Sequence, residues 1–357
     1  MVVVKQASHK TDAENLWNDK VEPITYQQYV EQTADTEKLL LFSESGGGKT
    51  TFYLEILNYL LKQGFTLDQI KMCIVFPDRP SGLVKLHGLI PKEFLPRIDI
   101  FPVNNYEETV KATASAHQIL VDHYKQHKVP GWSVFELMEN YWSFAQDYYS
   151  RQAFGKSLGE YFAQMQTILQ KSKADKKTAY EAFAGPFGGP WPIIKFFHNF
   201  NWMDRIKRFP YHVVFTSEIK QEDNDDSVFK SLGYRPAGEK HNQHRVDTIL
   251  YLSHKGNNFY MRPYKLTGYQ KLYPREDITG KNGYEEHRNQ LLELEKEGHC
   301  VSKIKHLEDT VGITPPKKPE KPKEQPVKEK KEEPKPKPKE EKKPEKKEES
   351  EDNMWEL

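Results

Sequence analysis

The chain has 357 residues, of which 36% are hydrophobic and 29% are charged, and its 53 basic and 52 acidic residues leave a formal net charge of +1. This balance excludes a histone-like positive coat, and two cysteines, Cys73 and Cys300, are too few for a disulfide framework. We find neither a signal peptide nor an apolar run of the ~18 residues that a membrane helix needs, and therefore expect a cytoplasmic protein without membrane contact.

The polar residues are concentrated at the C-terminal end. Residues 315–357 hold 14 Lys and 13 Asp or Glu, which leaves 39 basic and 39 acidic residues in the body. Residues 315–350 are almost only Lys, Glu and Pro, a composition that buries too little apolar surface to fold, so we expect a disordered tail. Its acidic tip ends in Met354, Trp355 and Leu357, which is typical of a tethered docking peptide for a protein partner. An inert chain end is the alternative.

Short apolar runs alternate with helical stretches along the body. The pattern predicts strands at 38–42, 70–78, 97–103, 132–138 and 211–218. It predicts helices at 50–64, 105–126, 138–150, 158–172, 191–207 and 284–297. Two late strands, 244–254 and 257–266, are expected to form an antiparallel hairpin. Strands separated by helices pair in parallel, so we predict an α/β fold with a mostly parallel central sheet flanked by helices, and late antiparallel strands.

The run "SESGGGKT", residues 43–50, lies between the first predicted strand and the first predicted helix. A phosphate-binding loop needs glycines for close approach of the backbone, a helix N-terminus, a lysine for the β and γ oxygens and a hydroxyl for magnesium. The loop departs from the usual pattern at its first position, where Ser stands for Gly, and its second residue is an acid that we expect to point to solvent. The nucleotide-binding residues we predict are Ser43, Glu44, Ser45, Gly46, Gly47, Gly48, Lys49, Thr50 and Thr51. A glycine-rich turn before a buried helix is the alternative, but it leaves Lys49 and Thr50 unexplained.

An acidic residue at the end of a neighbouring strand is the second part of such a site. In "WSVFELMEN", Glu136 follows the apolar residues of the fourth predicted strand. We predict that Thr50 and Glu136 hold magnesium. Glu139 is less favoured because it should already lie in the helix, and a surface glutamate facing water is the alternative for Glu136.

Four stretches between about residues 38 and 270 resemble the RecA-like P-loop ATPases of phages and archaeal viruses, usually described as AAA-type nucleotide-binding proteins. They are "LFSESGGGKTT", "WSVFELMENYWSFAQDYY", "YHVVFTSE" and "HRVDTILYLSHKGNNFYMRPYKLTGY". The resemblance implies a RecA-like P-loop NTPase fold, binding of ATP, hydrolysis with Mg²⁺, and work on DNA such as recombination or strand annealing. RecA-like proteins act in assemblies, so a homo-oligomer is one arrangement that the sequence leaves open, and a viral member would work in the host cell cytoplasm. Ser43 and Glu136 depart from the commonest residues of the family.

Hydrolysis requires a residue that orients the attacking water, and two acids are candidates. Asp78 closes the strand after the phosphate-loop helix, and Glu218 closes "VVFTSE". We favour Asp78 as base, with Thr216 or Ser217 as a sensor of the γ-phosphate. The alternative for Asp78 is a turn residue that caps its own backbone in "PDRP". The catalytic residues we predict are Lys49, Glu136, Asp78 and Glu218.

Basic and aromatic residues interleave in residues 259–275, a combination that binds single-stranded nucleic acid. The candidates are Arg262, Lys265, Lys271 and Arg275, with Tyr264, Tyr269 and Tyr273. An exposed hairpin edge protected by Lys and Arg is one alternative. Another is that Arg262 and Lys265 reach the γ-phosphate of a neighbouring subunit. The loop 184–192, "AGPFGGPWP", is a further candidate for DNA contact.

These patterns divide the chain into an N-terminal extension at 1–37, a P-loop NTPase domain at 38–275, a helical extension at 276–314 and the tail at 315–357. The function we predict is an ATP-hydrolysing enzyme acting on DNA. A non-hydrolysing, nucleotide-dependent switch or scaffold that recruits a partner through the tail is the alternative from another class. A DNA-packaging motor is a weaker one.

Overall fold

The computed structural model describes residues 36–77, 90–172, 190–222 and 227–300. The chain divides into two units, Met1–Lys305 and His306–Leu357, and every described residue belongs to the first. The predictions for residues 1–35, for Asp78, for most of the loop 184–192 and for the tail with its tip therefore lie outside the described residues.

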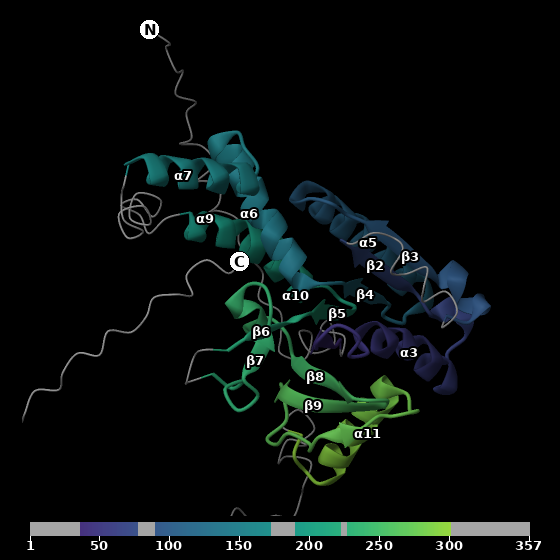
Figure 1. Cartoon of the computed structure of the whole chain (residues 1–357). Helices are drawn as coiled ribbons and strands as arrows, with labels where there is room; N and C mark the ends of the chain where they lie inside the picture. The colour runs from purple at the N-terminus through teal and green to yellow at the C-terminus, as the bar shows by residue number, and fades with distance from the viewer. Residues whose placement is uncertain (1–35, 78–89, 173–189, 223–226, 301–357) are drawn as a thin grey trace, which may run out of the picture. The chain divides into compact units, whose positions relative to one another are not determined.

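An eight-stranded sheet forms the centre of the described part, with the order β10-β9-β8-β1-β5-β4-β2-β3 (Figure 1). The strands are β1 Lys38–Phe42, β2 Met72–Phe76, β3 Ile98–Pro102, β4 Trp132–Phe135, β5 His212–Ser217, β8 Thr248–Lys255, β9 Asn258–Leu266 and β10 Glu276–Asp277. β8, β1, β5, β4, β2 and β3 pair in parallel, whereas β8–β9 and β9–β10 pair antiparallel. The α/β fold class with a mostly parallel sheet and late antiparallel strands is confirmed.

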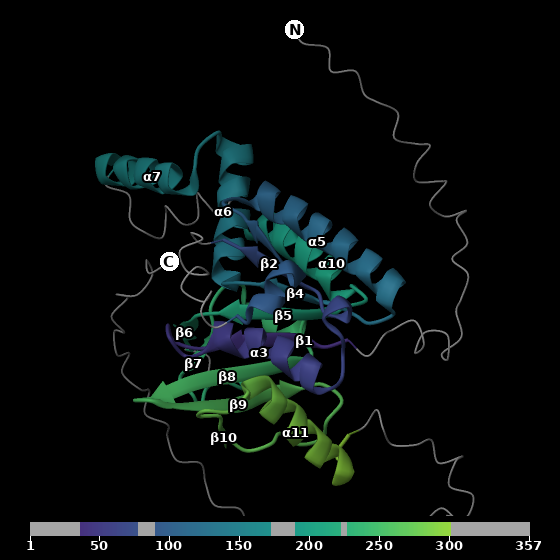
Figure 2. The same cartoon turned by 90° about the vertical axis from the view of Figure 1, so that its right-hand side faces the viewer.

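The helices cover both faces of this sheet. They are α3 Lys49–Lys62, α5 Tyr106–His127, α6 Met138–Phe154, α7 Leu158–Ser172, α9 Trp191–Lys195, α10 Asp204–Lys207 and α11 Gly283–Lys296, with short 3₁₀ turns at Leu67–Gln69, Lys92–Arg97 and Lys240–His244. In the two views, α3 and α11 lie near one another, and α7 lies beyond α6, away from the sheet (Figures 1 and 2). None of the helices in the described ranges is both long and apolar enough to cross a bilayer.

The parallel strands are apolar on both faces because both faces are covered. In β1, Leu39 and Leu41 pack in a core that includes residues of α3 and α11, such as Phe52 and Leu291. Leu40 and Phe42 of the same strand pack in the opposite core, which includes residues of α5, α6 and α10. The period of two along β1 therefore supplies side chains to two cores at once, and the loop after β1 emerges from the middle of the sheet.

Three regions differ from the sequence prediction. The helix predicted at 191–207 is interrupted by a π-helical segment, Phe196–Met203, between α9 and α10. Apolar periodicity does not distinguish α from π hydrogen bonding, so the interruption is invisible in the sequence. A small antiparallel sheet, β6 Ile219–Gln221 with β7 Tyr234–Pro236, and the two-residue edge strand β10 were also not predicted, since each is too short to show a period.

Candidate functional site

The site begins where three neighbouring parallel strands end. β1, β5 and β4 lie side by side, with Phe42 opposite Ser217 and Val134 opposite Val214. The residues that follow these strands are Ser43, Glu218 and Glu136. Because parallel strands end at the same edge of a sheet, the phosphate-loop sequence and both candidate acids are brought together.

The backbone of residues 43–48 curls through conformations that only glycine adopts readily. Gly46 and Gly48 have φ of 79° and 92°, and the Gly47 N–H donates to the Glu44 carbonyl at 3.1 Å. α3 begins directly afterwards at Lys49, so the amides of its first turn have no partner within the helix. The loop and helix end together present backbone N–H groups and the positive end of a helix dipole, which favours an anion.

Ser43 fits the loop because Gly47 has no side chain. The Ser43 side chain is fully buried. Its hydroxyl donates to the Glu44 carbonyl at 2.7 Å and accepts from Lys49 Nζ at 3.0 Å. A Cβ built on Gly47 would lie 2.5 Å from Ser43 Oγ, closer than any tolerated contact. With a serine at the first position of the loop, the fifth position therefore has room only for a glycine.

Lys49 is nearly buried, at 7% exposure, and its ammonium group is surrounded by oxygen atoms. Besides Ser43 Oγ, Nζ donates to the Ser43 and Glu44 carbonyls at 3.0 and 3.3 Å. It also forms an ion pair with Glu218 Oε1 at 3.1 Å, and the Glu218 side chain is 39% exposed. One candidate acid thus lies within contact of the lysine that we predict to bind phosphate oxygens, and the Glu44 side chain is exposed to solvent, as expected.

Glu136 is the buried acid of the site, at 4% exposure. Thr50 Oγ1 donates to Glu136 Oε1 at 3.2 Å, and Thr216 Oγ1 donates to Oε2 at 3.1 Å. Burial raises the pKa of Glu136, while hydrogen bonds, including those from Thr216 and Thr50, and the charge of Lys49 oppose that rise. A hydroxyl and a carboxylate in contact are the hard oxygen donors that Mg²⁺ prefers, so these residues fit the metal.

The two hydroxyls considered as phosphate sensors have other partners. Thr216 Oγ1 holds Glu136 and also accepts from Leu137 N at 2.9 Å. Ser217 Oγ donates to the carbonyls of Glu218 and Ala237 at 2.9 and 3.2 Å. Thr216 and Ser217 are both fully buried. Thr216 thus contacts Glu136, and both hydroxyls already have hydrogen-bond partners within the fold.

Glu139, which the sequence disfavoured, also belongs to the site. Both of its carboxylate oxygens accept from the backbone N–H of Glu218, at 3.4 Å each. Burial raises the pKa of Glu139, and the charge of Glu218 adds to the rise. Leu137 has a positive φ of 57°, which reverses the chain directly after β4. Because α6 then begins at Met138, Glu139 lies in the first turn of the helix, beside the strand ends. The backbone reversal at Leu137 has no sequence signal, because leucine rarely adopts that conformation.

The basic and aromatic segment at 259–275 is arranged differently from the prediction. Tyr264 and Tyr273 are buried, at 9% and 3% exposure, and the Tyr269 hydroxyl donates to Glu295 at 2.9 Å. Lys265 Nζ donates to the backbone carbonyls of Gln243 and Val246. Base stacking on Tyr264 or Tyr273 is thus incompatible with this packing, because these rings belong to the core.

Three cations of that segment remain exposed: Arg262, Lys271 and Arg275. Arg275 lies over the Tyr260 ring, 3.8 Å from its centroid, and Lys271 pairs with Glu297 at 3.5 Å. Arg262 lies 5.1 Å from the Tyr264 ring centroid. These contacts agree with the alternative of a hairpin edge protected by charge.

No protein-family model matches the chain, and no curated protein matches it. Among solved structures, the chain is similar to the assembled ATPase EscN from the type III secretion system of enteropathogenic E. coli, with 14% identity and a TM-score of 0.33. The similarity covers 61% of this chain and 43% of that chain, so it spans less than half of the EscN length.

Proposed function

We propose that the protein is an ATPase that binds ATP on the loop 43–50 and hydrolyses it with magnesium. The observation that carries the proposal is the arrangement around Lys49 and Thr50. The lysine contacts one acid, Glu218, and the threonine contacts another, Glu136. A glycine turn with a purely structural role does not require one acid at Lys49 and a second acid at Thr50.

In this proposal one group of residues binds the phosphates and another binds the metal. The loop amides and Lys49 would hold the phosphate oxygens, which take the place of Glu218 and the loop carbonyls as partners of the ammonium group. Thr50 and Glu136 would hold Mg²⁺, which neutralises charge on the transferred phosphoryl group when bound. Thr216 keeps the Glu136 carboxylate oriented toward Thr50.

Glu218 is the acid that we propose to orient the attacking water and accept its proton. Its side chain is partly exposed and lies at Lys49 Nζ, where the terminal phosphate is expected. When phosphate oxygens replace it at Lys49, the carboxylate is released beside the phosphate and is free to bind a water. Glu139, which accepts from the Glu218 amide, holds the chain in place at this position.

Glu218→Gln tests both the hydrolytic function and this role. We expect the turnover of ATP with magnesium to fall about 100-fold while the affinity for ATP stays within about threefold, since the amide binds water but accepts no proton. Glu107→Gln, an exposed change in the first turn of α5, is the matched control. Binding of ATP by the wild type without any turnover would instead support the nucleotide-dependent switch.

Single-stranded DNA is the target that we propose for the ATPase, following the family resemblance and its viral setting. Arg262, Lys271 and Arg275 are exposed in one stretch, so they are the side chains that would contact phosphates. Their joint replacement by alanine should weaken binding of an oligothymidine and reduce the salt dependence of that binding. If the change instead lowers turnover in the absence of DNA, these residues act between subunits of a homo-oligomer.

A further inference from the structure

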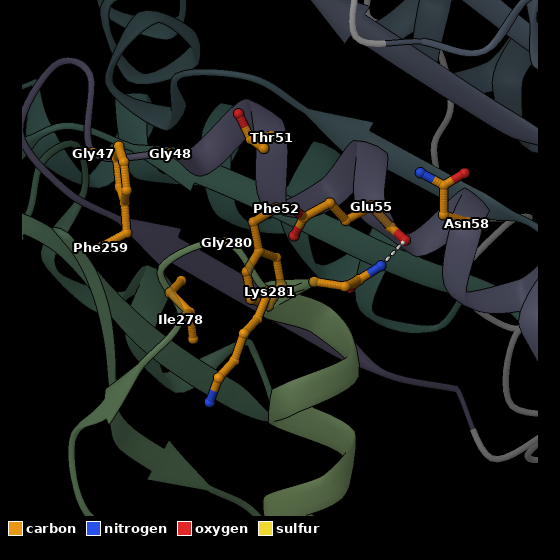
Figure 3. A pocket seen from close by; sticks show the side chains of 11 residues that line it. Gly47, Gly48, Thr51, Phe52, Glu55, Asn58, Phe259, Ile278, Gly280 and Lys281 are labelled. Carbon is orange, nitrogen blue, oxygen red and sulfur yellow. Dashed lines mark hydrogen bonds between the residues drawn. The ribbon is translucent and has the colours of Figure 1, made fainter. Parts of the chain in front are cut away.

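A cavity of about 610 Å³ opens beside the last glycines of the phosphate loop (Figure 3). Gly47, Gly48 and Thr51 form the end of the cavity nearest the loop. From there it continues along α3 past Glu55 and Asn58. These two residues and Thr51 lie four and three positions apart, so they share one face of the helix.

The opposite wall comes from later parts of the chain. Phe259, at the start of β9, and Ile278 and Lys281, in the segment between β10 and α11, line it. Figure 3 shows Phe259 beside Gly47 and Gly48, while Ile278 and Lys281 lie across from α3. The volume is within the ~300–1,000 Å³ that is usual for small-molecule sites.

The backbone of Phe259 is hydrogen-bonded to the segment before α11, and its ring lies beside the loop. Its backbone N–H donates to Thr279 Oγ1 at 2.8 Å, and its carbonyl accepts from Ile278 N at 2.9 Å. A Cβ built on Gly48 would lie 3.7 Å from a ring carbon of Phe259, so the ring borders the glycine directly. The side chain is only half-buried, which leaves part of a flat aromatic surface open to the cavity.

Glu55 supplies a polar group to the cavity wall. Its Oε2 accepts from the backbone N–H of Gly283 at 2.6 Å, and its carbonyl accepts from Asn282 Nδ2 at 2.8 Å. Among the hydrogen bonds of the described residues, none engages the other carboxyl oxygen, Oε1. The cavity therefore combines a fixed ring near the loop with a hydrogen-bond acceptor further along α3.

We propose that this cavity receives the base and ribose of a purine nucleotide, with Phe259 as the stacking surface and Glu55 as the acceptor for an N–H or O–H group. The inference rests on the proposed phosphate loop, because the cavity starts at Gly47 and Gly48, where a nucleoside attached to bound phosphates must leave the loop. A purine covers more of an aromatic ring than a pyrimidine does, so stacking selects the larger base.

Binding of ATP, CTP and inorganic tripolyphosphate to the full chain, measured by calorimetry with magnesium, separates the base from the phosphates. We expect Phe259→Leu, which keeps apolar volume but removes the ring, to lower ATP affinity about tenfold and to leave tripolyphosphate affinity within about twofold. The preference of the wild type for ATP over CTP should shrink in the same variant. Tyr260→Leu removes the neighbouring ring on the opposite face of β9 and is the matched control.

Glu55→Leu tests the acceptor in the same assay. Its ATP affinity should fall about fivefold, with tripolyphosphate unaffected, because one hydrogen bond to the nucleoside is lost. Thermal unfolding of each variant shows whether the junction of α3 and α11 is intact.

The outcomes distinguish the two levels of the proposal. Wild-type protein that binds neither ATP nor tripolyphosphate overturns the phosphate loop itself. Tripolyphosphate binding with equal ATP affinity in Phe259→Leu and Tyr260→Leu leaves the loop standing and overturns the base site. Parallel loss of ATP and tripolyphosphate in Phe259→Leu also overturns it, since the ring would then support only the loop.

Discussion

In the loop 43–50 the polar side chains lie at the ends of buried strands, whereas in the segment 259–275 Tyr264 and Tyr273 belong to the core and Lys265 is half-buried. Lys49 reaches an acid that is partly exposed, at 39%. Lys265 Nζ donates to two backbone carbonyls, those of Gln243 and Val246. Lys49 therefore has a partner that a phosphate group can replace, whereas Lys265 satisfies two backbone carbonyls of the fold.

The difference follows from where each stretch lies in the sheet. A residue just past a parallel strand is no longer paired, so its side chain and amide face the edge where neighbouring strands also end. A residue within β9 alternates between the two faces of the sheet, and every second side chain enters a core. Basic and aromatic residues within β9 are therefore a weak indication of binding. Tyr273, which lies beyond the end of β9, is buried for a different reason, because its hydroxyl packs against His287 of α11.

The largest effect that we expect is from Lys49→Ala. The variant should lose ATP affinity by about 100-fold or more, because no other side chain of the loop supplies a positive charge to the phosphates. Calorimetry with ATP and magnesium measures the loss, and thermal unfolding checks that the fold remains. Lys62→Ala, at the exposed end of the same helix, is the matched control. Equal ATP affinity in Lys49→Ala would refute the loop as the site.

Glu136→Gln should affect turnover rather than affinity. We expect a rate loss of about 100-fold with ATP affinity within about threefold, because the amide oxygen still accepts from one of the two threonine hydroxyls and its NH₂ donates to the other, but the amide has no charge for the metal. The magnesium dependence of the steady-state rate measures it. An unchanged rate and magnesium dependence would transfer the metal-holding role to Glu139 or Glu218.

Gly47→Ala, alone and combined with Ser43→Gly, tests whether the Ser43 side chain requires a glycine at position 47. The single alanine should lower ATP affinity about tenfold, since its Cβ would lie 2.5 Å from Ser43 Oγ. Ser43→Gly alone should change affinity by no more than about threefold, and the double variant should regain most of the loss. A double variant as weak as Gly47→Ala would show that the clash is not the cause.

Lys265→Ala and Lys271→Ala compare two lysines of the hairpin segment. The first should lower the free energy of unfolding by ~1–3 kcal/mol, because two backbone carbonyls lose their donor. The second removes an exposed ion pair and should change the free energy of unfolding by less than ~0.5 kcal/mol. Denaturant titrations measure both, and equal stabilities would contradict the structural role of Lys265.

Glu55 of α3 accepts from the backbone N–H of Gly283 at the start of α11, and its replacement has a small expected effect. Burial raises its pKa from 4.5 to about 7, so the folded protein retains a proton that the unfolded chain releases. Stability from this group is present below about pH 4.5 and is lost as the pH rises to about 7. Glu55→Gln should therefore gain stability relative to wild type across that interval, by about 1 kcal/mol, because the N-terminus of α11 offsets part of the penalty. Unfolding curves at pH 5 and pH 8 decide it, and a constant difference would contradict the shift.

The amino-acid sequence by itself determined the order of the longer strands and helices and the position of the glycine-rich loop between the first of each. These features are local, since a run such as "KLLLF" or three glycines before a lysine has the same conformational preference in most surroundings. The fold class follows from their alternation. The residues 43–50 and 136 could likewise be selected from the sequence, because each directly follows an apolar run.

Tertiary structure decided which side chains meet across long separations. Lys49 and Glu218 are 169 residues apart, and Thr50 and Glu136 are 86 apart, and no periodicity reports such distances. The same holds for the burial of Tyr264 and for the cavity between α3 and Phe259, which depends on α11 packing against α3. Sequence patterns describe the preference of a segment for a conformation, whereas contacts such as these exist only after the strands have taken their places in one sheet.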